Sequence, residues 1–153
     1  MPQSERVTVR VAALVIQDGR VLVVYQNKDG RMCWMLPGGT ADLGETFADV
    51  LQREMAEELG LELAVERPLA LVESISPEPD DYPVHMLHVI MLCSPQTPVD
   101  LDALEVTDEN TKDVRLMEPS QLTKLDLRPA IAEFLAQCVH RPPDGVRYLG
   151  VQW

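Results

Sequence analysis

The chain has few of the residues that mark secreted, metal-ribbon or disulfide-stapled proteins. Only 3 of its 153 residues are cysteines, and 5% are aromatic. Cys33, Cys93 and Cys138 lie far apart and show no C-x-x-C spacing, which argues against a disulfide framework or a zinc site. We therefore expect them to behave as small hydrophobic side chains in a reducing compartment.

Long apolar runs are also missing. No stretch of about 18 apolar residues occurs, and residues 1–10 contain Glu5, Arg6 and Arg10 instead of the apolar core of a signal peptide. The sequence therefore predicts a cytoplasmic protein that does not bind a membrane.

Basic residues are scarce. There are 13 of them against 25 acidic residues, which gives a formal net charge of −12. Stable binding of nucleic acid requires many phosphate-neutralising cations, so this balance argues against it. A small polyphosphate ligand would also be repelled unless divalent cations and a few local basic residues reversed the field. The acidity hints at a metal site, although a surplus of carboxylates is more often a solubilising surface.

The length predicts one domain, residues 1–141, that can bury its core without disulfides. Residues 142–145, Pro-Pro-Asp-Gly, then interrupt the chain before an apolar segment that ends at Trp153. We expect residues 142–153 to form an arm that docks as an extra strand on its own domain or on a partner subunit. In the second case the protein is a homodimer.

Two sequence periodicities define the expected elements. Apolar residues alternate over residues 7–15 and continue over 21–25 after a polar turn, which is typical of a β-hairpin. Residues 61–75 and 84–93 are further expected strands, separated by an exposed loop at 77–81.

Two segments show helical spacing instead. Residues 46–59 form one expected helix, with Gly60 at its C-cap, and residues 128–139 form the other. The order of strands, helix, strands and helix predicts an α/β (α+β) fold with a mixed sheet.

The first expected helix carries an unusual acidic flank. Arg53, Glu54, Glu57 and Glu58 fall within about 140° of the helix circumference, opposite the apolar residues. Carboxylates placed so close together repel one another, which hard divalent cations would relieve. Metal ions held there can neutralise and polarise a pyrophosphate. A solvated Glu-rich face is the simpler interpretation of the helix taken alone.

The spacing of this flank to residues upstream is more specific. The pattern G-x5-E-x7-R-E-U-x-E-E-x-G-U, with U a bulky apolar residue, is met at Gly39, Glu45, Arg53, Glu54, Met55, Glu57, Glu58, Gly60 and Leu61. A chance match at a given position is on the order of one in 10⁸. This pattern is the Nudix box, and the chain resembles the Nudix hydrolases, including MutT-like members. The segment Trp34-Met35-Leu36-Pro37-Gly38 also looks like the strand that enters the box.

The resemblance implies the Nudix fold, a mixed β-sheet sandwiched between helices. It also implies hydrolysis of a pyrophosphate bond in a nucleoside diphosphate linked to another group, X, with Mg²⁺ or Mn²⁺ as cofactor. By position, Glu54 and Glu58 would be the main metal ligands, Glu57 a further one, and Gly38 a ligand through its backbone carbonyl. Glu54 is also the implied general base, and Arg53 would hold the carboxylates in register.

Outside the box the sequence offers weaker candidates. Members of the family often place another acid on a later loop, and Glu109 is our choice, although a plain acidic loop explains it equally well. Arg31 and Trp34 are candidates for contacts to substrate phosphate and base. A surface arginine and a packed tryptophan are the alternatives.

The sequence leaves the substrate open. A nucleoside triphosphate, including oxidised forms, and ADP-ribose or another nucleotide sugar are the main candidates. A second hypothesis is a non-catalytic module that keeps the fold and senses nucleotides, although such modules usually lose a box carboxylate and this chain has all of them.

Overall fold

The structure is a computed structural model that describes residues 6–28, 31–78 and 84–153. Its strands are β1 (Thr8–Gln17), β2 (Arg20–Lys28), β3 (Arg31–Met35), β4 (Gly38–Thr40), β5 (Leu63–Ile75), β6 (His85–Pro95), β7 (Thr111–Met117) and β8 (Arg147–Val151). Its helices are α1 (Phe47–Leu59), a 3-10 turn (Leu101–Ala103), α2 (Pro119–Leu122) and α3 (Ala132–His140). The expected loop at 77–81 lies outside the described residues from position 79 onward.

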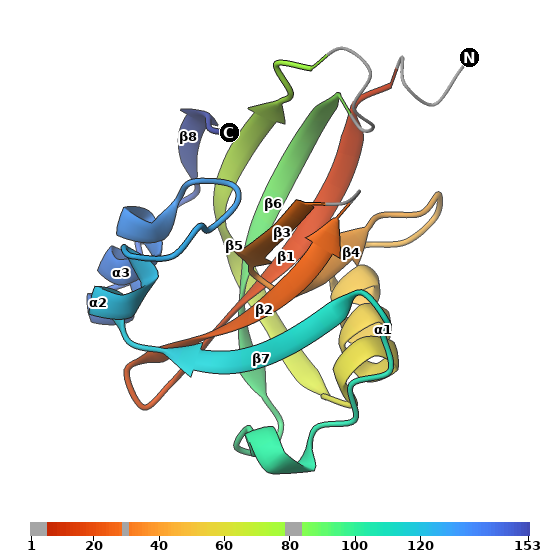
Figure 1. Ribbon diagram of the computed structural model, residues 1–153, viewed down its shortest axis with the longest axis vertical. Coiled ribbons are helices and arrows are strands. Elements are labelled where there is room, and N and C mark those ends of the chain that lie inside the picture. Colours follow the sequence, from red (N-terminus) through yellow and green to blue (C-terminus); the bar gives the residue numbers. More distant parts are fainter. Residues whose placement is uncertain (1–5, 29–30, 79–83) are drawn as a thin grey trace.

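The strands form one mixed sheet that bends into two halves (Figure 1). The strand order is β3-β2-β1-β6-β5-β8, while β4 pairs with β1 and β7 pairs with β2. Strand β1 runs parallel to β6 and antiparallel to β2 and β4. The predicted hairpin of β1 and β2 is therefore confirmed, and β1 is the central strand on which the two halves meet.

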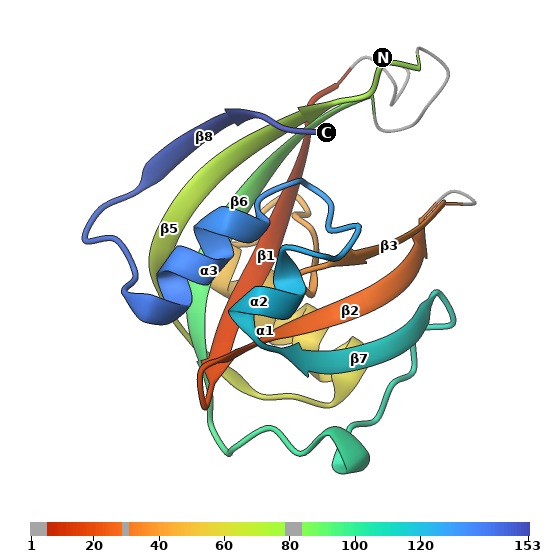
Figure 2. The same ribbon diagram turned by 60° about the vertical axis from the view of Figure 1, so that its left-hand side comes forward.

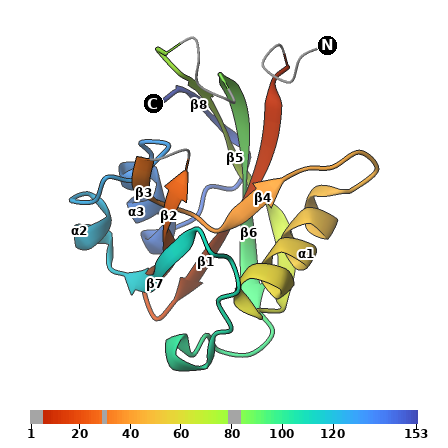
Figure 3. The same cartoon turned by 45° about the vertical axis from the view of Figure 1, so that its right-hand side comes forward.

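Helices cover the sheet on opposite sides, with α1 on one side and α2 and α3 on the other (Figure 3). Two hydrophobic clusters fill the layers between them. Leu51, Met55 and Leu59 of α1 belong to the first cluster, and Leu135 and Cys138 of α3 belong to the second. The predicted mixed sheet between helices is confirmed, and all three cysteines are buried.

Local sequence signals explain where α1 begins and ends. Thr46 and Asp49 form a reciprocal capping box at the N-terminus. Gly60 takes the left-handed conformation, with φ 66°, at the C-cap. The predicted helix over residues 46–59 is thus confirmed. It carries every carboxylate of the box that follows Glu45.

The second predicted helix begins later than its sequence pattern indicates. It was expected from Arg128, but α3 starts at Ala132. The intervening residues run beside β3 instead: the Trp34 N–H donates to Asp126 O at 2.9 Å and the Arg128 N–H donates to Trp34 O at 2.9 Å. Pro129 also disfavours a helical conformation at the residue before it. The expectation for residues 128–131 was therefore wrong.

The C-terminal arm docks on its own chain. Strand β8 runs parallel to β5 at the edge of the sheet (Figure 2). Tyr148 Oη donates to Glu73 Oε2, and the Gln152 N–H donates to Glu73 O at 2.8 Å. Val146, Tyr148 and Val151 remain exposed.

Within the described residues, no helix is long and apolar enough to cross a membrane.

Candidate active site

Two glycines bring the backbone of β4 against its neighbours. A Cβ at Gly38 would lie 2.0 Å from Val11 O, so a side chain there would collide with the backbone of β1. A Cβ at Gly39 would lie 2.3 Å from Cδ of Glu54 and 2.5 Å from its Oε1. The Glu54 carboxylate therefore occupies the space that a side chain at Gly39 would take. The turn at Gly39 therefore packs directly against α1 at Glu54.

Arg53 organises the exposed side of the acidic flank. Its Nε and Nη2 donate to the two carboxylate oxygens of Glu45, both at 2.8 Å. Its Nη1 donates to Glu54 Oε1 at 2.8 Å and lies 3.6 Å from Glu57 Oε2. The bidentate bond to Arg53 lowers the pKa of Glu45, and the same bonds raise the pKa of Arg53. Arg53 thus bonds Glu45 and Glu54 at the same time, while its role in catalysis stays a prediction.

Glu54 and Glu58 form a carboxyl pair at the inner side of the flank. Only 15% of the Glu54 side chain is exposed, and Glu58 is partly buried. Burial raises the pKa of Glu58 to about 8, helped by its hydrogen bond to Glu54 and by the charges of Glu54 and Asp108. Burial and the adjacent carboxylate therefore both disfavour the charged form of Glu58.

The loop after the 3-10 turn carries a further acid, Asp108, whose charge acts on Glu58. Thr107 caps the end of α1, with its N–H donating to Glu58 O at 3.1 Å and its hydroxyl donating to Glu57 O. The next residue, Asp108, is fixed by Thr111 Oγ1 at 3.0 Å and raises the pKa of Glu58 through its charge. The loop that carries Thr107 and Asp108 thus caps the C-terminal end of α1.

Glu109, our choice from the sequence, is exposed, and its backbone carbonyl accepts a bond from Lys112 Nζ at 2.7 Å. The structure places Asp108, its neighbour in the same stretch, nearer to the carboxyl pair. Sequence position alone could not separate the two, because which side chain turns inward depends on how the loop caps α1.

Arg10 is a buried basic residue whose charge acts on Glu58 and Glu54. Its side chain is buried, with 7% of the residue exposed, and its Nη2 donates to Leu36 O at 3.0 Å. Burial lowers the pKa of Arg10, and the charges of Glu58 and Glu54 oppose this shift. Sequence analysis missed this residue as part of the site. The available signal was a basic residue between apolar ones in a strand that is buried on both faces.

The structure places the two substrate candidates outside the carboxyl cluster. Arg31 is exposed, with its guanidinium 5.4 Å from the ring centroid of Trp153 in the C-terminal arm. Trp34 is partly buried and stacks on Tyr25 at 4.9 Å, with Arg115 5.7 Å from its centroid. Both Trp34 and Arg31 already have aromatic or cationic neighbours within the chain.

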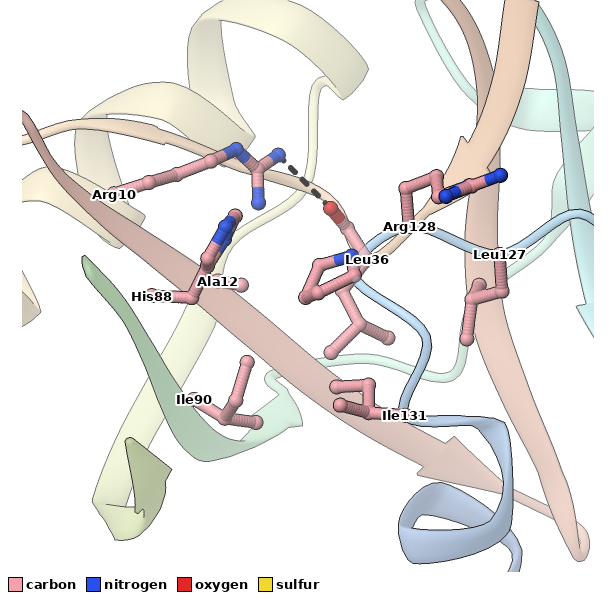
Figure 4. Close-up of a pocket in the computed structure, with 9 residues that line it drawn as sticks. Arg10, Ala12, Leu36, His88, Ile90, Leu127, Arg128 and Ile131 are labelled. Carbon is pink, nitrogen blue, oxygen red and sulfur yellow. Dashed lines mark hydrogen bonds between the residues drawn. The ribbon is translucent and has the colours of Figure 1, made fainter. Parts of the chain in front are cut away.

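A half-open recess adjoins Arg10 (Figure 4). It is small, with a free volume of about 10 Å³, which is room for about one water molecule. Three of the residues that line it are basic or imidazole side chains: Arg10, His88 and Arg128. The remaining walls are apolar and consist of Ala12, Leu36, Ile90, Leu127, Pro129 and Ile131. His88 Nε2 shares a hydrogen bond with Ser74 Oγ at 2.9 Å.

The donor set fits a hard divalent cation. Among the described residues, no group of three or more His, Cys, Asp or Glu side chains is placed so that it could hold a metal ion. Mg²⁺ needs no such cluster, because it usually binds one or two carboxylates and completes its shell with water and substrate phosphate. Glu54 and Glu58 supply such a pair, and burial together with the neighbouring Glu54 raises the pKa of Glu58.

The fold and this carboxylate flank define a hydrolase domain of the type that acts on phosphate anhydrides. A family model described as "NUDIX domain" matches residues 6–138. The chain therefore belongs to the Nudix hydrolase family.

The chain is only moderately similar to individual members of the family. The chain is 30% identical to the low-salt glycan biosynthesis protein Agl8 of Haloferax volcanii, over 72% of this chain and 70% of that protein. It is 43% identical to a putative 8-oxo-dGTP diphosphatase of Mycobacterium tuberculosis, over 35% of this chain and 40% of that protein. It is 28% identical to the ADP-ribose pyrophosphatase of Methanocaldococcus jannaschii, over 54% of this chain and 49% of that protein. The last two matches thus cover less than half of each relative.

Solved structures agree on the fold. The structure of an ADP-ribose pyrophosphatase from Streptococcus suis matches with a TM-score of 0.67 at 23% identity, covering 94% of this chain and 99% of that chain. A Nudix hydrolase from Nitrosomonas europaea matches with a TM-score of 0.71 at 17% identity, covering 88% and 89% of the two chains. At these identities the match shows the architecture and not the substrate.

Proposed function

We propose that this protein hydrolyses a pyrophosphate bond in a nucleoside diphosphate linked to X, in a reaction that depends on Mg²⁺ or Mn²⁺. The observation that supports it best is the Glu54–Glu58 carboxyl pair, in which burial and mutual repulsion raise the pKa of Glu58 to about 8. Such a pair is unfavourable unless a cation joins it. The net charge of −12 adds a second reason, because a polyphosphate needs cations to approach.

The proposed ligands are Glu54, Glu58 and, from the exposed side of the helix, Glu57. The carbonyl of Gly38 joins them in this proposal, since the missing side chains at Gly38 and Gly39 let the β4 backbone lie against the site. When bound, the divalent cation neutralises the pyrophosphate and polarises the phosphorus that is attacked.

The residues of the chain then have separate tasks. Glu54 is the proposed general base: Arg53 holds its Oε1 at 2.8 Å, which orients the carboxylate to accept a proton from the attacking water. Asp108, held by Thr111 at 3.0 Å, supplies further negative charge beside Glu58 and is a proposed additional support of the cation. In this proposal Arg53 orients the carboxylates of Glu45 and Glu54, and the buried Arg10 offsets part of the negative charge of Glu54 and Glu58.

The proposed substrates are small molecules. Nucleoside triphosphates, including oxidised forms, are supported by the similarity to the 8-oxo-dGTP diphosphatase, and ADP-ribose or nucleotide sugars by the similarity to ADP-ribose pyrophosphatases. The protein is proposed to act in the cytoplasm. Pairing of two copies through the arm is a further proposal, which a measurement of mass in solution tests against a variant truncated after Pro142.

The experiment that tests the function is a product screen with Mg²⁺ and with Mn²⁺. Nucleoside triphosphates, ADP-ribose, nucleotide sugars and dinucleoside polyphosphates are each incubated with wild type, Glu58→Gln and the control Glu62→Gln, whose side chain is exposed beyond the helix. We expect turnover of one class by wild type and the control, and loss of turnover in Glu58→Gln.

Equal turnover by Glu58→Gln would contradict the site. Tight nucleotide binding without cleavage of any tested pyrophosphate would instead support the sensing module.

A further inference from the structure

The loop that carries Asp108 is bonded to the box helix on one side and to two strands on the other. On the helix side, the Thr107 N–H donates to Glu58 O at 3.1 Å, and the loop runs past the C-terminal end of α1 (Figure 3). Asp108 therefore directly follows a residue that is bonded to the backbone of Glu58. This contact brings the loop to the carboxyl pair, and further contacts hold the Asp108 side chain there.

Two side chains of the sheet hold one oxygen of the Asp108 carboxylate. Gln26 Nε2 donates to Thr111 Oγ1 at 2.8 Å, and Thr111 Oγ1 donates to Asp108 Oδ2 at 3.0 Å. Gln26 Nε2 also lies 3.4 Å from the same Oδ2. A hydroxyl has one hydrogen, so Thr111 can accept from Gln26 and donate to Asp108 at the same time. We call this chain of bonds the Gln26–Thr111 relay, in which each bond orients the next.

A shift in strand register places the two residues of the relay opposite each other. Strands β2 and β7 pair Tyr25 with Asp113 but Gln26 with Thr111, so the register skips Lys112. Side chains alternate along β2, and this alternation puts Gln26 on the face of the strand that packs towards α1. Register shifts of this kind often redirect a side chain beside an active site.

Burial makes the relay specific. Only 9% of Thr111 is exposed, so its hydroxyl depends on partners within the protein. The other carboxylate oxygen, Asp108 Oδ1, accepts from the Asn110 N–H at 3.0 Å. Both oxygens of Asp108 are therefore held, and the charge of this carboxylate acts on Glu58. A cation at the carboxyl pair would experience the same negative charge, whose effect falls with distance.

We propose that Gln26 and Thr111 are positioning residues of the active site: their relay holds the Asp108 carboxylate near Glu58, where its charge strengthens binding of the divalent cation. Gln26 and Thr111 act through Asp108 and need no contact of their own with the cation. This inference rests on the proposed function and adds to it residues outside the box that tune the affinity for metal.

Binding of Mn²⁺ alone, without substrate, tests the relay. Electron paramagnetic resonance measures free Mn²⁺ in solutions of wild type, Asp108→Asn, Thr111→Val and Gln26→Met. We expect Asp108→Asn to weaken binding about tenfold, and each relay variant to weaken it about three- to fivefold.

Two matched controls carry the same changes elsewhere. Thr123→Val removes an exposed hydroxyl that donates to Ser120 O at 3.3 Å, and Asp144→Asn removes an exposed charge in the C-terminal arm. Both should bind Mn²⁺ within about twofold of wild type, because exposed charges and hydroxyls remote from the pair are screened by water.

A double-mutant cycle separates positioning from a general structural effect. Because the relay acts through Asp108, adding Thr111→Val to Asp108→Asn should weaken Mn²⁺ binding by no more than about twofold further. Thr111→Ser keeps the hydroxyl and should restore most of the wild-type affinity. Circular dichroism checks that each variant folds, and if Thr111→Val does not, Gln26→Met takes its place in the cycle.

Wild-type affinity in both relay variants, or a fully additive loss in the double variant, would overturn the proposal. Glu58→Gln, measured in the same way, distinguishes this failure from failure of the proposed function. If Glu58→Gln loses Mn²⁺ binding while the relay variants bind as wild type does, the metal site stands and the relay is wrong. If wild type binds no Mn²⁺, or no variant changes the affinity, both proposals are wrong.

Discussion

Two arginines flank the same carboxyl groups in opposite surroundings. Arg53 is about one-third exposed, with 31% of its side chain accessible, and contacts Glu45, Glu54 and Glu57. Arg10 is buried and donates to a backbone carbonyl. The hydrogen bonds of Arg53 raise its pKa, whereas burial lowers the pKa of Arg10.

This difference separates two roles. An exposed network orients side chains at little cost, since each charge keeps part of its hydration. A buried arginine loses most of its hydration, and its removal would leave Leu36 O and the charges of Glu54 and Glu58 without this partner. Arg53 therefore orients the acidic flank from the solvent side, whereas Arg10 offsets part of its charge from the buried side. Four experiments test the comparison.

The largest effect is expected from the carboxyl pair that lies between the two arginines. Glu54→Gln and Glu58→Gln should each lower kcat by about 10²–10³, because each removes a charged ligand worth several kcal/mol in the transition state. Steady-state kinetics with saturating Mg²⁺ measures the loss. A fall of less than tenfold in both variants would show that the reactive centre lies elsewhere.

The glycines of β4 should respond in different ways. Gly38→Ala places a Cβ 2.0 Å from backbone atom Val11 O, so we expect destabilisation by about 2–4 kcal/mol. Gly39→Ala meets only the flexible side chain of Glu54, which can move away. It should leave stability within about 1 kcal/mol while lowering kcat at least tenfold. Urea unfolding and kinetics on the same samples decide, and the reverse ranking would contradict the packing described.

Salt should separate the two arginines. Arg53→Met removes a partly exposed network, and 1 M NaCl should reduce the resulting loss of stability because salt screens charges that water can reach. Arg10→Met exchanges a buried charge for an apolar side chain but leaves Leu36 O without its donor, so we expect a change within about 2 kcal/mol that salt hardly alters. Urea denaturation of both variants at low and high salt makes the comparison, and equal salt sensitivity would contradict it.

The smallest effect concerns acid. The bond from Arg53 lowers the pKa of Glu45, so its contribution to stability is present above the unfolded-state value of 4.5 and is lost as pH falls through the lower folded-state value. Wild type should therefore lose slightly more stability than Glu45→Gln between pH 6 and pH 3. Urea titrations at several pH values measure this, with Glu62→Gln as the matched control. Parallel curves for wild type and Glu45→Gln would show that the bridge does not form in solution.

Much of the segment that carries the box, from Gly39 to Leu61, could be predicted from residues that are near one another in sequence. The capping box at Thr46, the glycine at position 60 and the flank of Arg53, Glu54 and Glu58 follow from helical spacing, and the structure has all of them. The expected role of Arg53 between Glu45 and Glu54 also agrees with the observed bonds. These are contacts within one turn–helix segment, where spacing determines direction.

Residues outside that segment were predicted less well. The start of the second helix at Arg128 was wrong because it depended on a loop whose course is decided by what it packs against, whereas the choice of Glu109 on the later loop stays a prediction. Thr107 caps α1 and so turns Asp108 toward Glu58, and residues 126–128 join β3 before α3 begins. Neither partner is near in sequence.

The sequence by itself therefore determined the family, the mixed α/β architecture and the helix that carries the carboxylates, because these depend on local periodicity and on one closely spaced motif. The tertiary structure alone decided that Arg10, from a strand more than forty residues earlier, lies close enough to Glu54 and Glu58 to offset part of their charge, and that it lines a small apolar recess together with His88. Long-range sheet pairing brings these groups together, and a buried charge reveals its purpose only when its neighbours are known.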